Sequence, residues 1–530
     1  MSGESKSKKA RTSFIRSELS EPDAIRLIKS SWEEGTDNRS DLSKIKVNVV
    51  QSPFKVCVVN DFFENTEILK SAVAELENVD FYPKNNDLYR FSQTDDLQNL
   101  TDFTYITQLY EVFRTEVHNW LGQVHTKETL KNEISATFSS YQFGDRLLCH
   151  DDKCEDRHIA FVIYLMDEWK EEFGGNLQLF SVDSDRYPQK VVETIVPQFN
   201  TIVFFEVTST SFHQVSEVLE KSNRLSLNGW FHSENKKHAD NDCEMIEYMY
   251  IPANDNDYNL NHYFLPNYLE YGNQVQIKTR FISDSEIQLE EFLIPTFLEE
   301  ISADLTSTKT KWDFVGPANI RRYEVADPAT LSPALSSMKD ILESKCWFSC
   351  LRSLTSLDLA PSRCSDLEIW SAGNEPTCKV EIQRWTPGCY SLIHDKDPDF
   401  QVKALDVFLR FPYDNREQNY PITIDDEDSP ETGHIIYIDK DSKDEECLLH
   451  IGYKMNSLSL IYRDAKTLRF TKYLDSTSEP FYQVACTYQP WSPPADQPDL
   501  RHRDSDSESE SSDMDSEVLQ CAEVEGMFFL

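Results

Sequence analysis

Five short segments with the composition of β-strands lie between residues 133 and 233. They are Ile134–Tyr141, Ile159–Met166, Leu177–Val182, Thr201–Val207 and Arg224–Phe231. Turn signals separate them: Gly174, Gly175, Pro188 and Pro197. Short strands in close succession, broken by glycine and proline, are typical of a β-sandwich or a β-barrel. This part of the chain therefore predicts a β-rich domain.

An amphipathic helix is predicted before these strands. Apolar side chains recur there at steps of three and four residues: Phe103, Ile106, Tyr110, Phe113, Val117 and Trp120. This spacing gives a helix with one apolar face. A second stretch of helices followed by strands comes after residue 258, with a helix expected near 286–304. The overall class is therefore α+β.

The length of the chain favours two domains, because 530 residues exceed what one ordinary core organises. We expect a disordered basic tail at 1–25, a first domain at 26–235, a polar linker at 236–258 and a second domain at 259–530. The second domain contains a segment rich in Ser, Asp and Glu at 495–518. Such a composition cannot bury a core, so this segment is predicted to be disordered.

Charge and hydropathy restrict the classes of partner. The net charge is −40 and the pI is about 4.6. Phosphate groups would be repelled, so we expect no direct binding to nucleic acid, whereas a basic protein would be attracted. High solubility is the alternative reason for such a charge. No apolar run approaches the roughly 18 to 20 residues of a membrane span, so no membrane segment is expected.

The N-terminus and the cysteines favour a reducing compartment. Met1–Arg11 is polar and basic with no apolar stretch behind it, so we expect no signal peptide. Its basic residues form either a nuclear import signal or part of a solvated tail: Lys6, Lys8, Lys9 and Arg11. The twelve cysteines include no CxxC pair, which favours free thiols. We therefore expect the protein in the cytoplasm and the nucleus.

One HxD motif meets the requirements of a non-heme iron site. The 2-His-1-carboxylate triad holds Fe(II) on one face and leaves the other face open for co-substrate and oxygen. His150 and Asp152 lie between predicted strands, and His213 follows the strand Thr201–Val207. Strand ends converge in a barrel, so residues distant in sequence can share a site. We therefore predict that His150, Asp152 and His213 are metal ligands.

Two further HxD pairs lack this context. His238 and Asp240 lie in the polar linker, without flanking strands. His502 and Asp504 begin the acidic tail, and no histidine follows them. HxD alone is thus a weak signal, and a surface histidine beside a turn is the alternative for each pair. The first pair is favoured because a later histidine and an arginine accompany it.

That arginine is Arg224, which begins a strand eleven residues after His213. A guanidinium fork pairs with a carboxylate in bidentate geometry, as the distal carboxylate of 2-oxoglutarate requires. Ser226 lies on the same strand face and could add a hydrogen bond. Tyr164 could donate its hydroxyl to the same carboxylate, although a tyrosine in such a strand is more often a core residue. We expect Asp151 to face solvent.

Two other classes of protein fit part of this pattern. A zinc hydrolase could use the same two histidines and aspartate, but Arg224 would then have no role and the chain contains no HExxH motif. A non-catalytic scaffold with an oxygenase fold could bind a basic protein partner. Formation of succinate from 2-oxoglutarate with Fe(II) and ascorbate, compared with Zn(II), separates these classes.

Several segments of the first domain resemble one family. They are Tyr141–Asp145, His150–Asp152, Ile159–Leu165, Phe173–Leu177 and Ser211–Val218. Together they resemble the prolyl-hydroxylase superfamily and, more narrowly, the Fe(II)- and 2-oxoglutarate-dependent oxygenases that hydroxylate a ribosomal protein. The resemblance is strongest from about 130 to 233 and continues through the second domain.

The resemblance implies two tandem double-stranded β-helix (jelly-roll) domains, each with supporting helices. It implies Fe(II) at His150, Asp152 and His213, and 2-oxoglutarate at Tyr164 and Arg224, with O2 as co-substrate and ascorbate as the reductant. The implied reaction is C3 hydroxylation of a proline in the small-subunit ribosomal protein of the decoding centre. An effect on the accuracy or termination of translation would follow.

The second domain is predicted to be a non-catalytic copy of the first. Gly144 precedes His150 by six residues, and Gly388 precedes His394 by six. Aligned on these histidines, Asp152 corresponds to Lys396 and Tyr164 to Phe408; aligned on Asn200 and Asn456, His213 corresponds to Arg469. A lysine and an arginine cannot act as ligands while protonated. A coincidental match of the glycine and the histidine is the alternative.

Overall fold

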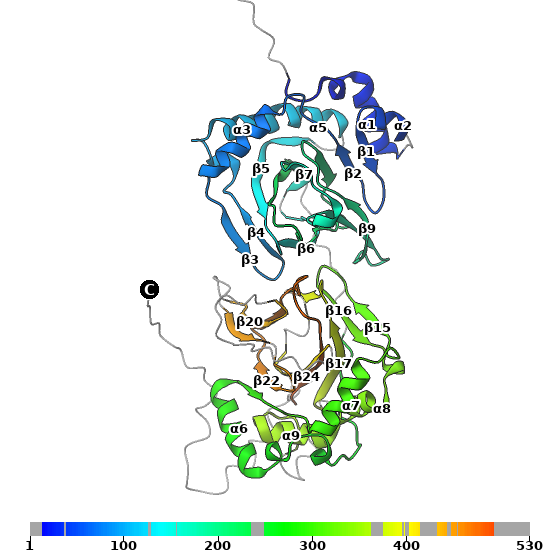
Figure 1. Cartoon of the computed structure of the whole chain (residues 1–530), viewed down its shortest axis with the longest axis vertical. Coiled ribbons are helices and arrows are strands. Elements are labelled where there is room, and N and C mark those ends of the chain that lie inside the picture. The colour runs from blue at the N-terminus through cyan, green and yellow to red at the C-terminus, as the bar shows by residue number, and fades with distance from the viewer. Residues whose placement is uncertain are drawn as a thin grey trace, which may run out of the picture.

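The structure is a computed structural model of the whole chain. It describes residues 13–35, 39–125, 129–154, 156–234, 248–361, 375–394, 397, 402–413, 432–441, 447–452 and 454–491. Two curled antiparallel sheets lie one above the other, and the helices cover the two outer ends (Figure 1). Within the described residues, no helix is both long and apolar enough to span a membrane.

The first sheet has the strand order β1-β2-β10-β7-β12-β5-β4-β6-β11-β8-β9, with β3 paired to β4. Its strands are β1 (Val47–Val50), β2 (Val56–Val59), β3 (Tyr82–Asn85), β4 (Tyr89–Gln93), β5 (Leu130–Tyr141), β6 (Arg146–His150), β7 (Arg157–Tyr164), β8 (Leu177–Val182), β9 (Pro188–Ile195), β10 (Ile202–Glu206), β11 (His213–Val215) and β12 (Arg224–Ser233). The five predicted strands therefore exist. Their antiparallel pairing and curvature agree with a jelly-roll fold.

The sequence predicted a turn at Pro188, but this residue is the first of β9. The strand β9 lies at the edge of the sheet. Proline is tolerated at the first residue of an edge strand because the missing N–H breaks no ladder hydrogen bond there. A proline that reads as a turn signal can thus equally mark the start of a strand.

The helices of the first unit are α1 (Pro22–Glu34), α2 (Arg39–Lys44), α3 (Glu67–Glu75), α4 (Thr104–Val112) and α5 (His118–Val124). The predicted helix at 103–120 is confirmed as α4 and α5, joined by a π-helical turn over Phe113–Val117. Its apolar face is buried against the outer side of the sheet, together with Trp32 of α1 and Phe161 of β7. The interior of the curled sheet holds a separate cluster that includes Tyr164 and Phe205.

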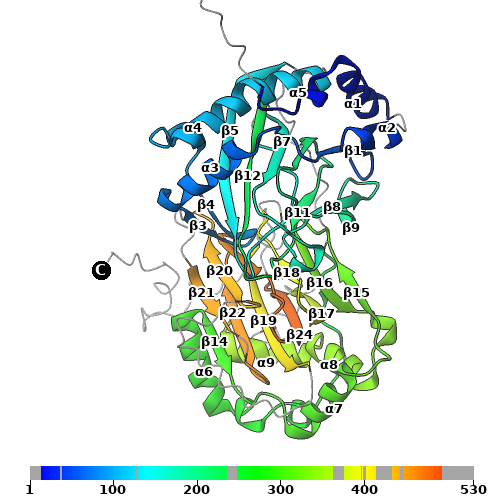
Figure 2. The ribbon, with the colours of Figure 1, turned by 45° about the horizontal axis from the view of Figure 1, so that its top comes forward.

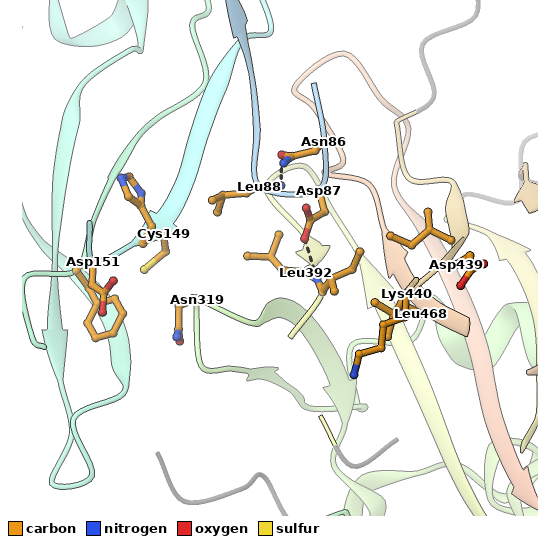
Figure 3. Close-up of a pocket in the computed structure, with 14 residues that line it drawn as sticks. Asn86, Asp87, Leu88, Cys149, Asp151, Asn319, Leu392, Asp439, Lys440 and Leu468 are labelled. Atoms are coloured by element: carbon orange, nitrogen blue, oxygen red, sulfur yellow. Dashed lines mark hydrogen bonds between the residues drawn. The ribbon is translucent and has the colours of Figure 1, made fainter. Parts of the chain in front are cut away.

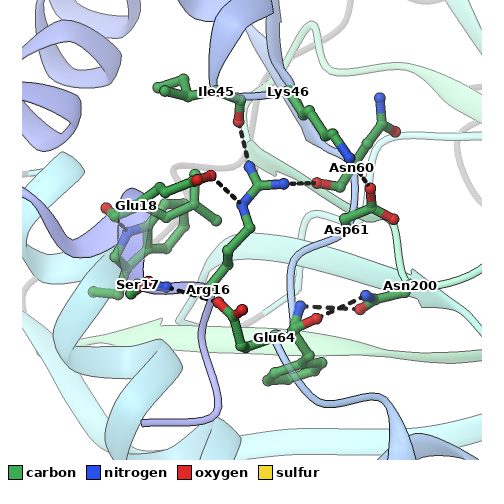
Figure 4. A network of polar contacts seen from close by, with 12 residues as sticks. Arg16, Ser17, Glu18, Ile45, Lys46, Asn60, Asp61, Glu64 and Asn200 are labelled. Atoms are coloured by element: carbon green, nitrogen blue, oxygen red, sulfur yellow. Dashed lines mark hydrogen bonds and ion pairs between the residues drawn. The ribbon is translucent and has the colours of Figure 1, made fainter.

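Residues 13–25 are not a tail. Ile15 and Leu19 are buried in the first core, and α1 begins at Pro22. Figure 4 shows Arg16 of this segment, whose guanidinium donates to the carbonyl oxygens of Asn60 and Ile45. The first domain therefore begins near residue 13, since these contacts join the segment to the core. Residues 1–12 lie outside the described part of the chain.

The second sheet has the order β14-β22-β19-β24-β17-β16-β18-β23-β20-β21, with β15 paired to β16 and β13 to β17 (Figure 2). Its strands are β13 (Ile251–Pro252), β14 (Glu286–Leu289), β15 (Trp312–Val315), β16 (Arg321–Ala326), β17 (Thr377–Trp385), β18 (Tyr390–Ser391), β19 (Ala404–Pro412), β20 (Ile435–Asp439), β21 (Cys447–Ile451), β22 (Leu458–Arg463), β23 (Thr467–Thr471) and β24 (Phe481–Gln489). Its helices are α6 (Tyr271–Asp284), α7 (Pro295–Leu305), α8 (Pro333–Leu342) and α9 (Lys345–Thr355).

Two boundaries of the second unit differ from the prediction. The helix expected near 286–304 begins only at Pro295, because residues 286–289 form β14 and pair with β22. The linker is shorter than 236–258, since Ile251 and Pro252 already pair with β17. The acidic segment 495–518 lies outside the described residues.

Polar contacts join the two units. The carboxylate of Asp87, between β3 and β4, accepts the backbone N–H of Ile393 at 2.8 Å. Glu217 accepts the N–H of Ser476 at 3.1 Å and its hydroxyl at 2.9 Å. The two sheets therefore form one composite body around the space between them.

Candidate metal centre

His150, Asp152 and His213 come together at one end of the first sheet. His150 is the last residue of β6, His213 is the first of β11, and the two are directly paired across these strands. Their ring centroids are 4.3 Å apart. Asp152 follows β6 by two residues and has a φ of 62°, in the left-handed region that non-glycine residues rarely adopt. The antiparallel pairing thus brings together two ligands, His150 and His213, that are 63 residues apart in the sequence.

The three side chains present their ligand atoms to one another. Asp152 Oδ1 lies 3.4 Å from His150 Nε2, and Asp152 Oδ2 lies 3.5 Å from His213 Nε2. The Nδ1 atom of His150 lies 2.7 Å from the carbonyl of Leu148, and that of His213 lies 2.8 Å from the carbonyl of Ser211. A carbonyl accepts, so each Nδ1 carries the proton and each Nε2 keeps its lone pair for a metal.

The charge states also suit a cation. Burial would raise the pKa of Asp152, but the neighbouring His213 and His150 hold it below its usual range. Burial and the nearby His150 lower the pKa of His213 to about 4. At neutral pH the site therefore offers a carboxylate and the neutral imidazole of His213, which are the forms that bind a metal. Burial would lower the pKa of His150, but the neighbouring Asp152 carboxylate raises it above its usual value.

Arg224 lies buried beside this group, with 2% of its surface exposed. Its Nε donates to the carbonyl of Gly175 at 2.6 Å, and its Nη1 donates to the hydroxyl of Ser226 at 3.3 Å. The guanidinium lies 4.9 Å from the ring of Tyr141 and 5.3 Å from the ring of Tyr164. Among the described residues it makes no ion pair, so a buried cation is available for an anionic ligand.

Tyr164 lies beside the Arg224 guanidinium. Its side chain is fully buried, and its hydroxyl has no hydrogen-bond partner in the described part of the chain. A buried hydroxyl without a partner costs about 1–3 kcal/mol, so a ligand that accepts from it would be favoured. A cation and a donor on one wall fit the distal carboxylate of a 2-oxo diacid. The residues present therefore fit both Fe(II) and 2-oxoglutarate.

Gly175 is required for this arrangement. Its φ is 62°, and a Cβ atom there would lie 2.7 Å from Cδ of Arg224. Gly174 is equally restricted, because its Cβ would lie 1.9 Å from the carbonyl oxygen of Glu217. The sequence indicated a turn at these glycines, but not that they make room for Arg224.

A cavity of about 500 Å³ opens beside His150, between the two units (Figure 3). Asp151 lines it and is half-buried rather than solvent-facing. The second unit contributes Asn319, Leu392 and Asp439 to its wall. No local motif marks these residues, since they come from three separate segments, and sequence reasoning missed them.

Each sheet has an asparagine with a positive φ two residues before a corresponding strand: Asn200, at 56°, before β10 and Asn456, at 48°, before β22. The N–H of Asn200 donates to the carbonyl of Tyr164, and that of Asn456 donates to the carbonyl of Arg410, each at 3.0 Å. Tyr164 therefore corresponds to Arg410. The predicted counterpart, Phe408, was wrong because Arg410 follows His394 by two residues more than Tyr164 follows His150.

The counterpart of His213 is Arg469, as the alignment on the asparagines predicted. Val215 pairs with Leu177, and Thr471, two residues after Arg469, pairs with Ile435 in the same position of the second sheet. Lys396, the predicted counterpart of Asp152, lies outside the described residues.

A buried ion cluster occupies the second interior. Arg469 Nη1 lies 2.9 Å and Arg463 Nε lies 3.1 Å from Oδ2 of Asp406, and both Asp406 and Arg463 are fully buried. The hydroxyl of Tyr437 donates to the same oxygen at 3.0 Å. This carboxylate is therefore satisfied by protein groups.

Comparisons with known proteins agree with this geometry. The model of the 2OG-Fe(II) oxygenase superfamily matches residues 136–232. The model described as the C-terminal degradation domain of oxoglutarate and iron-dependent oxygenases matches residues 255–496. The family match on the first unit covers all residues of the candidate metal centre.

Curated relatives extend over nearly the whole chain. Prolyl 3-hydroxylase OGFOD1 of Xenopus laevis is 32% identical over 499 residues, which cover 90% of this chain and 93% of the relative. The protein of the same name from Mus musculus is 32% identical, with 88% of this chain and 92% of the relative covered. The crystal structure of a Pseudomonas putida prolyl-4-hydroxylase aligns with 37% of this chain and 97% of its own, at 20% identity and a TM-score of 0.28.

Proposed function

Because this chain belongs to the prolyl 3-hydroxylase family within the 2OG-Fe(II) oxygenases, we propose that it hydroxylates C3 of a proline in a basic small-subunit ribosomal protein of the decoding centre. The family uses Fe(II), 2-oxoglutarate and O2 and acts on a protein substrate. The effect proposed for the cell is a change in the accuracy or termination of translation. The proposed location is the cytoplasm and the nucleus, and ascorbate is the proposed reductant.

One observation carries this proposal: three ligand atoms converge beside a buried arginine that has no ion-pair partner among the described residues. We assign Fe(II) to His150, Asp152 and His213. When bound, Fe(II) with 2-oxoglutarate and O2 supplies the oxidising power that breaks a proline C–H bond and leaves succinate and carbon dioxide.

The side chains of this unit hold and orient the reactants. Arg224 and Tyr164 bind the distal carboxylate of 2-oxoglutarate, with a guanidinium fork and a hydroxyl donor. Tyr141 covers one face of that guanidinium, and Ser226 fixes its orientation. The apolar interior of the sheet, including Phe205 beside His213, keeps bulk water from the site.

The net charge of −40 supports a basic substrate, because a strongly acidic protein attracts and steers a basic partner. The cavity beside His150, which Asp87, Asp151 and Asp439 line, would give such a substrate access to the metal site.

The second unit is, in this proposal, a second double-stranded β-helix that has lost its metal site. Its strand order repeats that of the first sheet position by position. At one end, β14 and β22 correspond to β2 and β10, and at the other end, β20 and β21 correspond to β8 and β9. Arg469 at the position of His213 would repel a divalent cation. Its role is therefore structural or in substrate binding.

Two measurements test the activity and the substrate separately. Purified protein should form succinate from 2-oxoglutarate with Fe(II) and ascorbate, and should not do so with Zn(II). Mass spectrometry of small-subunit ribosomal proteins, from cells with and without this protein, should show a +16 Da shift on the decoding-centre protein only when it is present. An unchanged mass there would refute the substrate while leaving the oxygenase activity standing.

A further inference from the structure

The cavity beside His150 is composite, because two distant parts of the chain build its walls. The first unit contributes the turn between β3 and β4, at Asp87, together with His150 and Asp151. The second unit contributes Asn319 and Asp439. Figure 3 shows Asn319 between the first-unit residues Cys149 and Asp151 on one side and Leu392 on the other. A polypeptide that reaches the iron through this cavity would therefore contact both units.

Asn319 carries an unsatisfied acceptor. Its Oδ1 atom is buried and has no hydrogen-bond partner among the described residues. The backbone around it is fixed: the N–H of Ala318 donates to the carbonyl of Pro188 at 3.3 Å, and the hydroxyl of Tyr390 donates to the carbonyl of Ala318 at 2.6 Å. Buried amide oxygens in proteins are normally hydrogen-bonded, so this one indicates a missing donor.

The opposite wall is equally fixed. The carboxylate of Asp87 accepts the N–H of Ile393, and the carbonyl of Leu88 accepts the N–H of Leu148 at 3.0 Å. The turn between β3 and β4 is thereby attached to the second unit on one side and to β6 on the other. Because the backbone of both walls is held by these hydrogen bonds, the walls can position an extended peptide without first becoming ordered.

The lining is acidic. Apart from His150, its charged residues are Asp87, Asp151, Asp439 and Lys440, which gives three carboxylates and one ammonium group. The cavity therefore favours a segment with basic side chains, in keeping with the charge of the whole chain.

We propose that the second unit forms part of the substrate site. Asn319 accepts a hydrogen bond from a backbone N–H of the substrate, and Asp151 and Asp439 attract basic side chains that flank the target proline. This inference rests on the proposed function, since it takes a proline-containing protein as the substrate.

The hydrogen bond is tested with two substitutions at one position. Asn319→Leu removes the acceptor at similar volume, whereas Asn319→Asp keeps an acceptor oxygen. The probe is a fluorescent 20-residue peptide with a central proline and lysines on both sides. We expect Asn319→Leu to weaken its binding about fivefold or more, and Asn319→Asp to bind as tightly as the natural protein or more tightly.

Peptide binding is measured by anisotropy and does not depend on turnover. A failure to hydroxylate the ribosomal protein would therefore leave this test intact. Equal binding by Asn319→Leu and the natural protein, or no binding of the peptide by the natural protein, would overturn the inference.

The charge contribution has its own matched control. Asp439→Lys should weaken binding of the lysine-flanked peptide about tenfold, and should have little effect on the same peptide with glutamines in place of the lysines. Glu299→Lys makes the same charge change at an exposed position of α7, outside the cavity. Equal effects of the two lysine variants would show a dependence on net charge alone and would refute the role of Asp439.

Discussion

The two sheets share one strand order but hold opposite chemistry inside. The first interior places two imidazoles and a carboxylate within 4.8 Å of one another, beside the buried cation of Arg224. The second places Arg463 and Arg469 on the carboxylate of Asp406. The first set offers ligand atoms to a metal and a cation to an anion, whereas in the second the carboxylate is already paired with two guanidinium groups. The same backbone arrangement therefore carries two functions, and the side chains at a few positions decide between them.

The difference can be traced to single positions. An arginine at 469 supplies charge where the first sheet supplies a ligand, since a guanidinium has no lone pair to offer a metal. Arg410 and Phe481 stand where the first sheet has Tyr164 and Arg224, and the Arg410 guanidinium lies 5.0 Å from the Phe481 ring. The buried arginine is thus Arg224 of β12 in the first sheet and Arg410 of β19 in the second.

The largest effect is expected at the first site. Asp152→Ala and His213→Ala each remove one of three ligands. Removing a group that hydrogen-bonds to a metal ligand typically lowers metal affinity or activity about 10- to 100-fold. Removing a ligand itself should therefore lower the rate of succinate formation by more than about a hundredfold. Iron in the full-length variants should fall from one equivalent to none. One equivalent left in these variants would place a metal elsewhere, in the second sheet or at the buried group His125, His158 and Glu206.

The second site should instead matter for stability. Asp406→Ala leaves the fully buried Arg463 without its carboxylate, and breaking such a pair costs about 3–5 kcal/mol of the free energy of unfolding. Denaturant unfolding measures this loss. Succinate formation per folded molecule should be unchanged, and a selective loss of iron binding in this variant would contradict the separation of roles.

The same carboxylate gives a pH dependence. Burial would raise the pKa of Asp406, but Arg469 and Arg463 hold it below the usual value of 3.8. A carboxyl group with a lowered folded-state pKa stabilises the protein above its unfolded-state pKa, and this contribution is lost as the pH falls through the folded-state pKa. We therefore expect the unfolding free energy of the natural protein to fall more steeply below pH 4 than that of Asp406→Asn.

A smaller effect is expected at the anchor of 2-oxoglutarate. Arg224→Lys keeps the charge but loses the bidentate fork, which should raise the KM for 2-oxoglutarate about 10- to 100-fold. Iron content should stay near one equivalent. The matched control is Arg410→Lys in the second sheet, which should leave this KM unchanged. Equal shifts in both variants would mean that the two interiors are not functionally distinct.

The sequence predicted the centre of the first site better than its surroundings. His150 and Asp152 could be selected from a short HxD pattern between predicted strands, and His213 and Arg224 from their positions beside later predicted strands; the structure brings the three ligands together. Tyr164 was assigned only through the family resemblance. The start of β9 at Pro188 was missed because proline marks a turn and an edge strand alike.

The remaining misses depend on tertiary contacts. The sequence alignment matched Tyr164 with Phe408, two residues before its true counterpart Arg410. The number of residues in a loop follows no periodic pattern, so the sequence could not reveal this shift. Asn319 and Asp439 were not found at all, because their place in the cavity depends on how the two units pack together.

The smallest effect is expected at Arg469. The side chain of Arg469 is 20% exposed. When Arg469 is replaced, the carboxylate of Asp406 still accepts hydrogen bonds from Arg463 and Tyr437. Arg469→Gln should therefore lower the free energy of unfolding by only about 1 kcal/mol. Arg469→His restores the residue type of His213, yet it leaves Asp406 bound to Arg463 and provides no carboxylate at the position of Asp152. Iron measured in this variant should remain at one equivalent per chain, and a second equivalent would mean that the second interior lacks only a single ligand.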